Sequence, residues 1–163
     1  MPIHLFWGDN RDARQKTIEK LIEKIVDPAW KALNVSRFDG KDIEQVNRLL
    51  EEVRTPPFGN GSRVLVAETS PFCNGCSSEL ANKFENVIEL IPKETHLILS
   101  NSLKPDGRLR TTKQIQKLVK LEIAEEKKFM LPAIWDINGQ KELVEQTAKE
   151  LNLEIENEAI NIL

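Results

Sequence analysis

Short apolar runs alternate along the chain with longer segments in which apolar residues recur every three or four positions. The first pattern is typical of buried strands, and the second is typical of helices with one apolar face. The apolar runs predict strands over residues 3–7, 63–67, 96–100 and 127–131, and alternation of apolar and polar residues predicts another over residues 35–39. The sequence predicts helices over residues 11–26, 43–53 and 77–91, and another that begins at a Thr111 or Thr112 cap.

This alternation predicts an α/β fold with a mainly parallel sheet. The strands are short and lack a polar face, as expected when helices cover both sides of a sheet. Right-handed crossovers would wind them into a three-layer sandwich. From Lys141 onward the pattern is helical only, and its last apolar stripe, Ala159, Ile160 and Leu163, is unfinished. We expect an α/β domain over residues 1–138 and the truncated beginning of a helical domain over residues 139–163.

The turn after the first predicted strand is where a nucleotide-binding α/β fold carries its phosphate loop, G-x-x-x-x-G-K-[ST]. The segment keeps Gly8 and a Lys-Thr pair but lacks the second glycine. Asp9 and Asp12 would repel a phosphate in this turn. Only a lone Glu68 follows the third predicted strand, so the acidic pair of a metal-assisted hydrolase is missing too. We expect a structural turn that binds no nucleotide.

Cys73-Asn74-Gly75-Cys76 is the sharpest local pattern in the sequence. A redox pair needs a helix N-terminus to lower the thiol pKa, and the helix predicted from residue 77 would provide one. A zinc site needs two further ligands, yet the only histidines, His4 and His96, lie on predicted strands. A thiol redox or metal-binding α/β domain using Cys73 and Cys76 is therefore the alternative function. We favour two small structural residues, and expect no metal and no cofactor.

Thr55-Pro56-Pro57-Phe58 ends the second predicted helix, because two prolines cannot continue its hydrogen bonds. Phe58 is then either folded back onto the core or held out as an apolar wedge on a stiff stem. Phenylalanine is mostly buried, which by itself favours the core. A wedge preceded by prolines, however, would enter a partner's pocket at a low ordering cost.

Composition limits the class of partner. The 163 residues carry a net charge of -3 with a pI of about 5.6, which argues against binding nucleic acid through an overall positive field. One local basic run could contact DNA or an acidic partner, although a solvated face is an equal interpretation. Its candidate contact residues are Lys104, Arg108, Arg110 and Lys113.

No apolar stretch could span a bilayer, and two cysteines form no disulfide framework, so we expect a cytoplasmic protein.

Several segments, taken in order along the whole chain, resemble the delta subunit of bacterial DNA polymerase III, and are most similar to cyanobacterial members. They are Ile3-His4-Leu5-Phe6-Trp7-Gly8-Asp9-Asn10, Phe38-Asp39-Gly40, Leu50-Glu51-Glu52-Val53-Arg54-Thr55-Pro56-Pro57-Phe58, Arg63-Val64-Leu65-Val66, Lys104-Pro105-Asp106-Gly107-Arg108-Leu109 and Ala148-Lys149-Glu150-Leu151-Asn152-Leu153-Glu154-Ile155.

The resemblance implies an AAA+-like first domain without a working phosphate loop, followed by a helical lid. It implies a non-catalytic subunit of the polymerase holoenzyme that binds and helps open the beta sliding clamp during DNA replication. The family's apolar wedge, Leu-Phe or a similar pair, falls on Pro57 and Phe58, within a clamp-binding segment of Thr55, Pro56, Pro57 and Phe58. The implied partners also include the gamma/tau and delta prime loader subunits, and primer-template DNA through the assembled complex, but no membrane.

Overall fold

The computed structural model describes residues 2–153, and these residues divide into two compact units, Met1–Phe129 and a second that begins at Met130. The first unit contains β1 (Ile3–Trp7), α1 (Arg11–Ile25), the 3-10 turn η1 (Pro28–Trp30), α2 (Lys31–Asn34), β2 (Val35–Asp39), α3 (Ile43–Glu52), β3 (Arg63–Glu68), α4 (Ser78–Ile88), β4 (Thr95–Asn101), α5 (Arg110–Lys120) and β5 (Ala124–Lys128). The second contains α6 (Ile137–Glu150).

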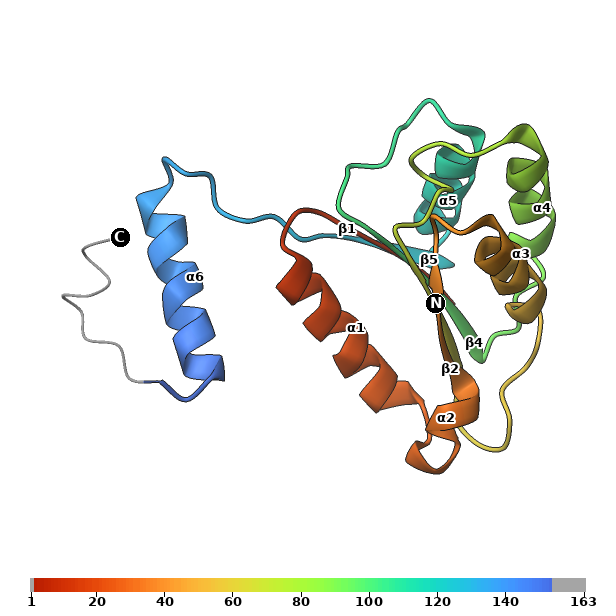
Figure 1. The fold of residues 1–163 in the computed structure, drawn as a ribbon, viewed down its shortest axis with the longest axis horizontal. Helices are drawn as coiled ribbons and strands as arrows, with labels where there is room; N and C mark the ends of the chain where they lie inside the picture. The colour runs from red at the N-terminus through yellow and green to blue at the C-terminus, as the bar shows by residue number, and fades with distance from the viewer. Residues whose placement is uncertain (1, 154–163) are drawn as a thin grey trace. The chain divides into compact units, whose positions relative to one another are not determined.

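The strands form one five-stranded sheet in the order β2-β3-β4-β1-β5, and every pair is parallel (Figure 1). The chain starts in the interior of the sheet, crosses to the β2 edge, returns through β3 and β4, and then passes to the other side of β1. This order confirms the predicted α/β fold. All carboxyl ends of the strands lie along one edge, and all amino ends along the opposite edge.

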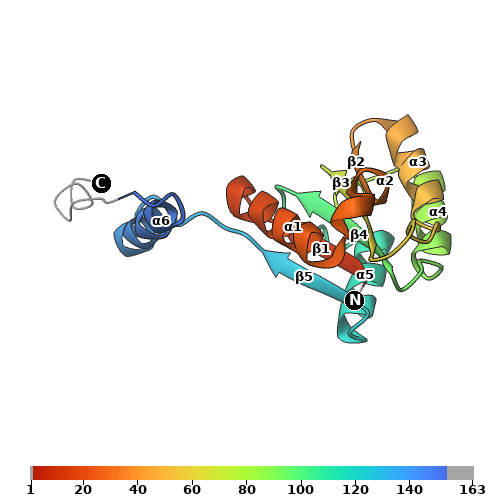
Figure 2. The same cartoon turned by 90° about the horizontal axis from the view of Figure 1, so that it is seen from below.

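Helices cover both faces of the sheet, with α1 on one face and α3, α4 and α5 on the other (Figures 1 and 2). Side chains that alternate along each strand feed two separate cores. On the α1 side, Ile18 and Ile22 pack in one core with Phe6, Val66 and Ile98. The larger core on the other side includes Leu5, Leu49, Leu65, Phe84 and Leu99. The three layers therefore match the predicted sandwich.

The last strand lies three residues earlier than predicted, at Ala124–Lys128 instead of residues 127–131. Its sequence, Ala-Glu-Glu-Lys-Lys, has one buried apolar residue and gives no apolar run. An edge strand pairs on one side only and tolerates such charge. Backbone pairing to β1 defines β5, and the apolar residues after Lys128 misled the prediction.

The predicted threonine caps of α5 are also wrong, because the helix begins at Arg110 after Leu109 and has no side-chain cap. Thr111 and Thr112 lie buried in its first turn, where the Thr111 hydroxyl donates to the carbonyl oxygen of Phe72. The short segments η1 and α2 were not predicted, since so few residues show no periodicity. The third helix of the prediction ends earlier than expected, at Ile88.

In the second unit, Asp136 caps α6 by accepting a hydrogen bond from the Gly139 amide at 2.9 Å. The helix therefore begins before the Lys141 of the prediction. The expected stripe of Ala159, Ile160 and Leu163 lies outside the described residues. The lid assignment of residues 139–163 stays a prediction. Within residues 2–153, no helix has the length and apolarity needed to cross a membrane.

Candidate functional site

The segment with Thr55–Phe58 is the loop between α3 and β3, at the amino edge of the sheet. Helix α3 ends at Glu52, and the following Val53 is fully buried against the core. Pro56 is exposed and Pro57 is half-buried. The Phe58 side chain is 48% exposed, so it is not folded into the core. Its assignment as a wedge stays a prediction, but its ring is accessible to a partner.

Asn34 holds the backbone of Phe58 while leaving the ring free. The Asn34 side-chain amide donates to the Phe58 carbonyl oxygen at 2.8 Å, and the Phe58 amide donates to Asn34 Oδ1 at 2.8 Å. Asn34 is fully buried at the end of α2. A buried amide that satisfies both backbone groups of one residue fixes that residue's position, because losing either bond leaves a polar group unpaired.

Arg63 supports the ring from the protein side. Its guanidinium carbon lies 5.6 Å from the centre of the Phe58 ring, within cation–π range. The Arg63 side chain is buried and donates to Glu52 Oε2 at 2.8 Å. Glu52, the last residue of α3, thus holds the Arg63 guanidinium near the ring, about half of which remains exposed.

The stem of the loop is anchored as well. The hydroxyl of buried Thr95, at the start of β4, donates to the Thr55 carbonyl oxygen at 2.8 Å. The Thr55 amide donates to the Glu52 carbonyl oxygen at 2.9 Å. Beyond Phe58, the Ser62 amide donates to the Ile25 carbonyl oxygen at 2.9 Å. With Pro56 and Pro57 between these anchors, the loop has little conformational freedom to lose on binding.

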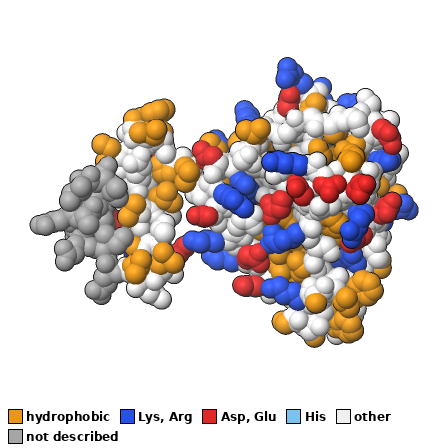
Figure 3. All heavy atoms as spheres, in the orientation of Figure 1, with side chains coloured by type: hydrophobic (Ala, Val, Ile, Leu, Met, Phe, Trp, Pro, Cys, Tyr) orange, Lys and Arg blue, Asp and Glu red, His pale blue; other side chains and the backbone are white. Residues whose placement is uncertain are grey.

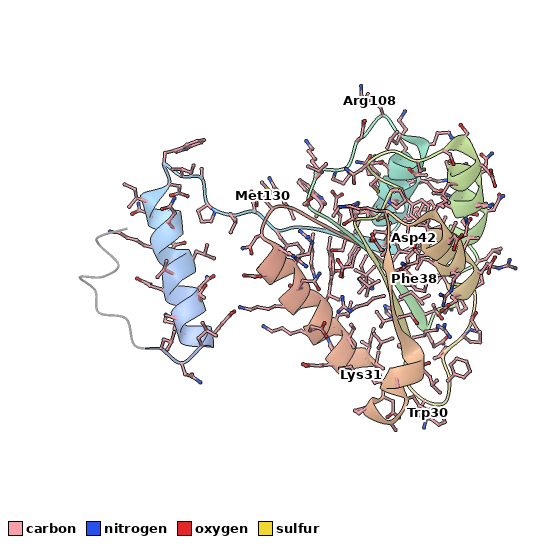
Figure 4. The ribbon with its side chains drawn as sticks, viewed as in Figure 1. Trp30, Lys31, Phe38, Asp42, Arg108 and Met130 are labelled. Carbon is pink, nitrogen blue, oxygen red and sulfur yellow. The ribbon has the colours of Figure 1, made fainter. Side chains whose placement is uncertain are left out.

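The predicted basic contacts lie at the opposite edge of the sheet. Lys104 and Arg108 are exposed in the loop after β4, and Arg110 and Lys113 occupy the first turn of α5. Figure 4 shows Arg108 at one end of the first unit and Trp30, which precedes α2, at the other. The structure brings these four cations to one region and keeps them away from Phe58.

Two of these cations are partly neutralised. Arg108 pairs with Asp106 at 2.8 Å, and the hydrogen bonds from Arg108 hold the pKa of Asp106 down to about 2. Arg110 donates to Asn82 Oδ1 at 2.9 Å and lies 3.5 Å from Glu85. Lys104 and Lys113 make no ion pair with any described residue, which leaves them as the more available contacts for phosphate.

The Gly8 turn has no open cradle for a phosphate. The Gly8 amide donates to the Asn101 carbonyl oxygen at 3.0 Å, and the Asn10 amide donates to that of Phe129 at 3.1 Å. A Cβ atom on Gly8 would lie 1.9 Å from the same Phe129 oxygen. The buried Arg14 donates to the Gly8 carbonyl oxygen. The amides of Gly8 and Asn10 are therefore already bound within the protein, which supports the interpretation of a structural turn.

Glu68, at the end of β3, serves a local ion-pair cluster. Its Oε1 accepts from Arg37 at 2.8 Å and from Gln15 at 2.9 Å. Arg37 also donates to Glu19 on α1. These contacts tie β2 and β3 to α1 and give Glu68 a structural use in place of a catalytic one.

The two cysteines do not form an activated pair. Cys73 is fully buried in the larger core, and burial raises the pKa of its thiol to about 12. Burial also raises the pKa of Cys76. A reactive thiol needs a lowered pKa, so this environment disfavours the redox alternative. Within residues 2–153, no group of three or more His, Cys, Asp and Glu is placed to hold a metal ion.

Sequence patterns did not indicate the residues that position Phe58. Asn34, Arg63 and Thr95 are polar residues buried at the ends of elements, and only the tertiary structure brings them to the loop. Burial of polar side chains is rare unless they are paired, but burial itself cannot be read from isolated positions.

Solved structures with a similar fold include two that are about twice as long as this chain. One is the DNA clamp loader delta protein of Bacillus subtilis, with 20% identity and a TM-score of 0.71 over 98% of this chain and 46% of that one. The other is AMPPCP-bound DnaA from Aquifex aeolicus, with 15% identity and a TM-score of 0.55 over 99% of this chain and 49% of that one. These likenesses show an AAA+-like fold.

No curated protein sequence gives a significant match. The family model described as DNA polymerase III, delta subunit, matches residues 4–128. That match covers well over half of the chain and includes all of β2 to β5 and all of β1 except Ile3. The chain therefore belongs to the DNA polymerase III delta subunit family.

Proposed function

We propose that the first unit is a clamp-binding module of a clamp-loader delta subunit, and that Phe58 is its apolar wedge. Family membership supports the general role, and the exposed Phe58 ring on a fixed backbone carries the specific assignment. Thr55, Pro56 and Pro57 form the stem. Pro57 is half-buried and takes the place of the leucine in the Leu-Phe pair that the resemblance implies.

The energetics favour a small but decisive contact. Full burial of an aromatic side chain is worth roughly 1.5–3 kcal/mol, and about half of the Phe58 side chain is already buried in the free protein. Little of the free energy from burying the rest of the ring is lost to ordering the loop, because Asn34 and the anchors at Thr55 already fix the backbone. Burial of the exposed half of the ring would contribute about 0.8–1.5 kcal/mol. Truncation to alanine would also leave the partner's pocket unfilled, so the expected loss reaches at least about 1.4 kcal/mol.

Clamp opening would follow from a preference for one state of the clamp. The module favours the open ring only if its contacts, including those of the exposed face of α3, are stronger in that state. Its partners in the loader would be gamma/tau and delta prime. Nucleotide hydrolysis would belong to partner subunits, since the amides of Gly8 and Asn10 are already bound within this protein. The second unit would begin the lid, and the loader would act in the cytoplasm. We also propose that the chain is most similar to cyanobacterial members of the family.

The test is the binding of this chain to the purified sliding clamp of the same organism. Phe58→Ala is expected to weaken the affinity at least about tenfold, or 1.4 kcal/mol. Leu103→Ala, which removes a 67% exposed leucine at the opposite edge of the sheet, is the matched control and should bind as the unmodified chain does. Equal affinities for the Phe58 variant and the unmodified chain would remove the wedge assignment.

A further inference from the structure

A second group of exposed apolar side chains lies next to the loop between α3 and β3, residues 53–62, which carries Phe58 and is called the wedge loop below. Trp30 is 39% exposed and Leu33 is 53% exposed, and they precede the buried Asn34 in the continuous segment formed by η1 and α2. They are three positions apart, so they share one side of this helical segment. Figure 3 shows hydrophobic side chains gathered over α2 and the adjoining loop.

Trp30 is in contact with the wedge loop. A Cβ atom built on Gly59 would lie 2.3 Å from Cε2 of the Trp30 indole, so the indole packs directly against the Gly59 backbone. Gly59 has a φ of 61°, which also favours glycine there. One residue earlier, Asn34 holds Phe58 through two hydrogen bonds. The η1–α2 segment and the wedge loop are therefore one rigid structure.

We infer that Trp30 and Leu33 extend the wedge into a three-residue apolar contact surface, and that all three side chains bind the same sliding clamp. This inference rests on the proposed function of Phe58. The argument for this occupant is continuity: a partner that covers Phe58 meets the Trp30 indole across the backbone of Gly59. A single half-exposed ring is also a small anchor, whereas exposed patches that bind proteins usually span several hundred Å².

The tryptophan content of the chain provides a direct readout. Of the three tryptophans, Trp7 is buried, and Trp135 is 86% exposed in the second unit. In a Trp135→Phe background, Trp30 is the one exposed indole. The chain is labelled with 5-hydroxytryptophan, which is excited at wavelengths that the clamp's own tryptophans do not absorb. Acrylamide quenching is then measured with and without saturating clamp.

We expect the clamp to reduce quenching of Trp30 at least about twofold, and Leu33→Ala to weaken clamp affinity about threefold to tenfold. Leu103→Ala is again the control. If Phe58→Ala weakens binding while Trp30 stays equally quenched and Leu33→Ala binds normally, the extended surface is wrong and the wedge stands. If the unmodified chain does not bind the clamp, both proposals fail. Leu33 is more than half exposed, so its truncation should leave the fold intact, and circular dichroism would check this.

Discussion

At the residue scale, the candidate site depends on polar side chains that are themselves buried. Asn34, Arg63 and Thr95 occupy three different elements and converge on one loop. Each of them satisfies a group that would otherwise be unpaired or supports the exposed ring. The sequence pattern indicated Phe58 and its prolines, but Asn34 is 24 positions away and has no local signal. A single sequence cannot predict a side chain whose role is created by tertiary contact.

The role of Asn34 in holding the Phe58 backbone can be tested by Asn34→Ala. This change removes both bonds to the Phe58 backbone, so we expect the free energy of unfolding to fall by about 1–3 kcal/mol. Clamp affinity should fall as well, because the loop loses its order before binding. Urea denaturation and the clamp-binding assay measure the two effects. Asn86→Ala, at an exposed position of α4, should change neither, and a fully stable, tightly binding Asn34 variant would contradict this role.

At the element scale, alternation of apolar runs was sufficient to predict the parallel sheet and its covering helices. Strands β1, β3 and β4 are buried on both faces, so each shows an apolar run that marks its place. The edge strand β2, Val-Ser-Arg-Phe-Asp, has only Phe38 buried and was predicted from its alternating residues. Strand β5 failed as a prediction because an edge strand is defined by its pairing, and its own residues are mostly charged. The threonine caps failed because Thr111 and Thr112 pack inward instead of closing the helix end.

The closed Gly8 turn predicts a strong effect of Gly8→Ala. A methyl group there would meet the Phe129 carbonyl oxygen, and the φ of 132° is unfavourable for alanine. We expect a loss of more than about 2 kcal/mol of stability. Gly107→Ala is the matched control, since a Cβ at Gly107 meets nothing within 4 Å, and it should be neutral within about 0.5 kcal/mol. Thermal melting of both variants measures the difference. Equal stabilities would mean that the Gly8 turn has room for a side chain and is not closed.

Three titratable side chains, one on each of the neighbouring strands β4, β1 and β5, are hydrogen-bonded in a row. His4 Nδ1 lies 2.6 Å from Glu125 Oε1, and His4 Nε2 lies 2.9 Å from His96 Nδ1. Burial lowers the pKa of His4 from its ordinary value of 6.5, and burial together with the neighbouring His4 lowers the pKa of His96 to about 4. Both imidazoles are therefore neutral in the folded protein at pH values where the unfolded chain already binds protons.

Stability should consequently be complete above the unfolded pKa of 6.5 and decrease as the pH falls toward 4. The slope is at most about 1.4 kcal/mol per pH unit for each extra proton bound by the unfolded chain. Urea denaturation between about pH 7 and about pH 5 measures this slope. His96→Gln removes one of the titrating groups and should flatten it, whereas an unchanged slope would place the acid sensitivity elsewhere.

At the scale of the whole first unit, the two predicted contact surfaces occupy opposite edges of the sheet. Phe58 lies where the strands begin, and the basic residues from Lys104 to Lys113 lie beyond the carboxyl end of β4. The order of the residues along the chain did not reveal this separation. It follows from parallel pairing, which assigns each loop to an edge once the strands are known.

This separation predicts independent effects of charge reversal. The double variant Lys104→Glu and Lys113→Glu should bind the clamp within about twofold of the unmodified chain, since its changes are remote from Phe58. In the assembled loader, the same variant should retain primer-template DNA less well, with a weaker dependence on salt concentration. Filter binding across a salt series measures the second effect. A loss of clamp affinity alone would mean that the basic region, and not the wedge edge, faces the clamp.

The buried Cys73 thiol gives the protein a built-in reporter of its own opening. Thiol-modifying reagents react with the thiolate, and a pKa of about 12 leaves almost none of it while the core is closed. Cys76 is only partly covered and is accessible without unfolding. Under conditions where reclosing is slower than alkylation, the labelling rate of Cys73 therefore measures the rate at which the native core comes apart. A mass spectrometer could follow this lifetime inside the assembled loader, without any engineered probe.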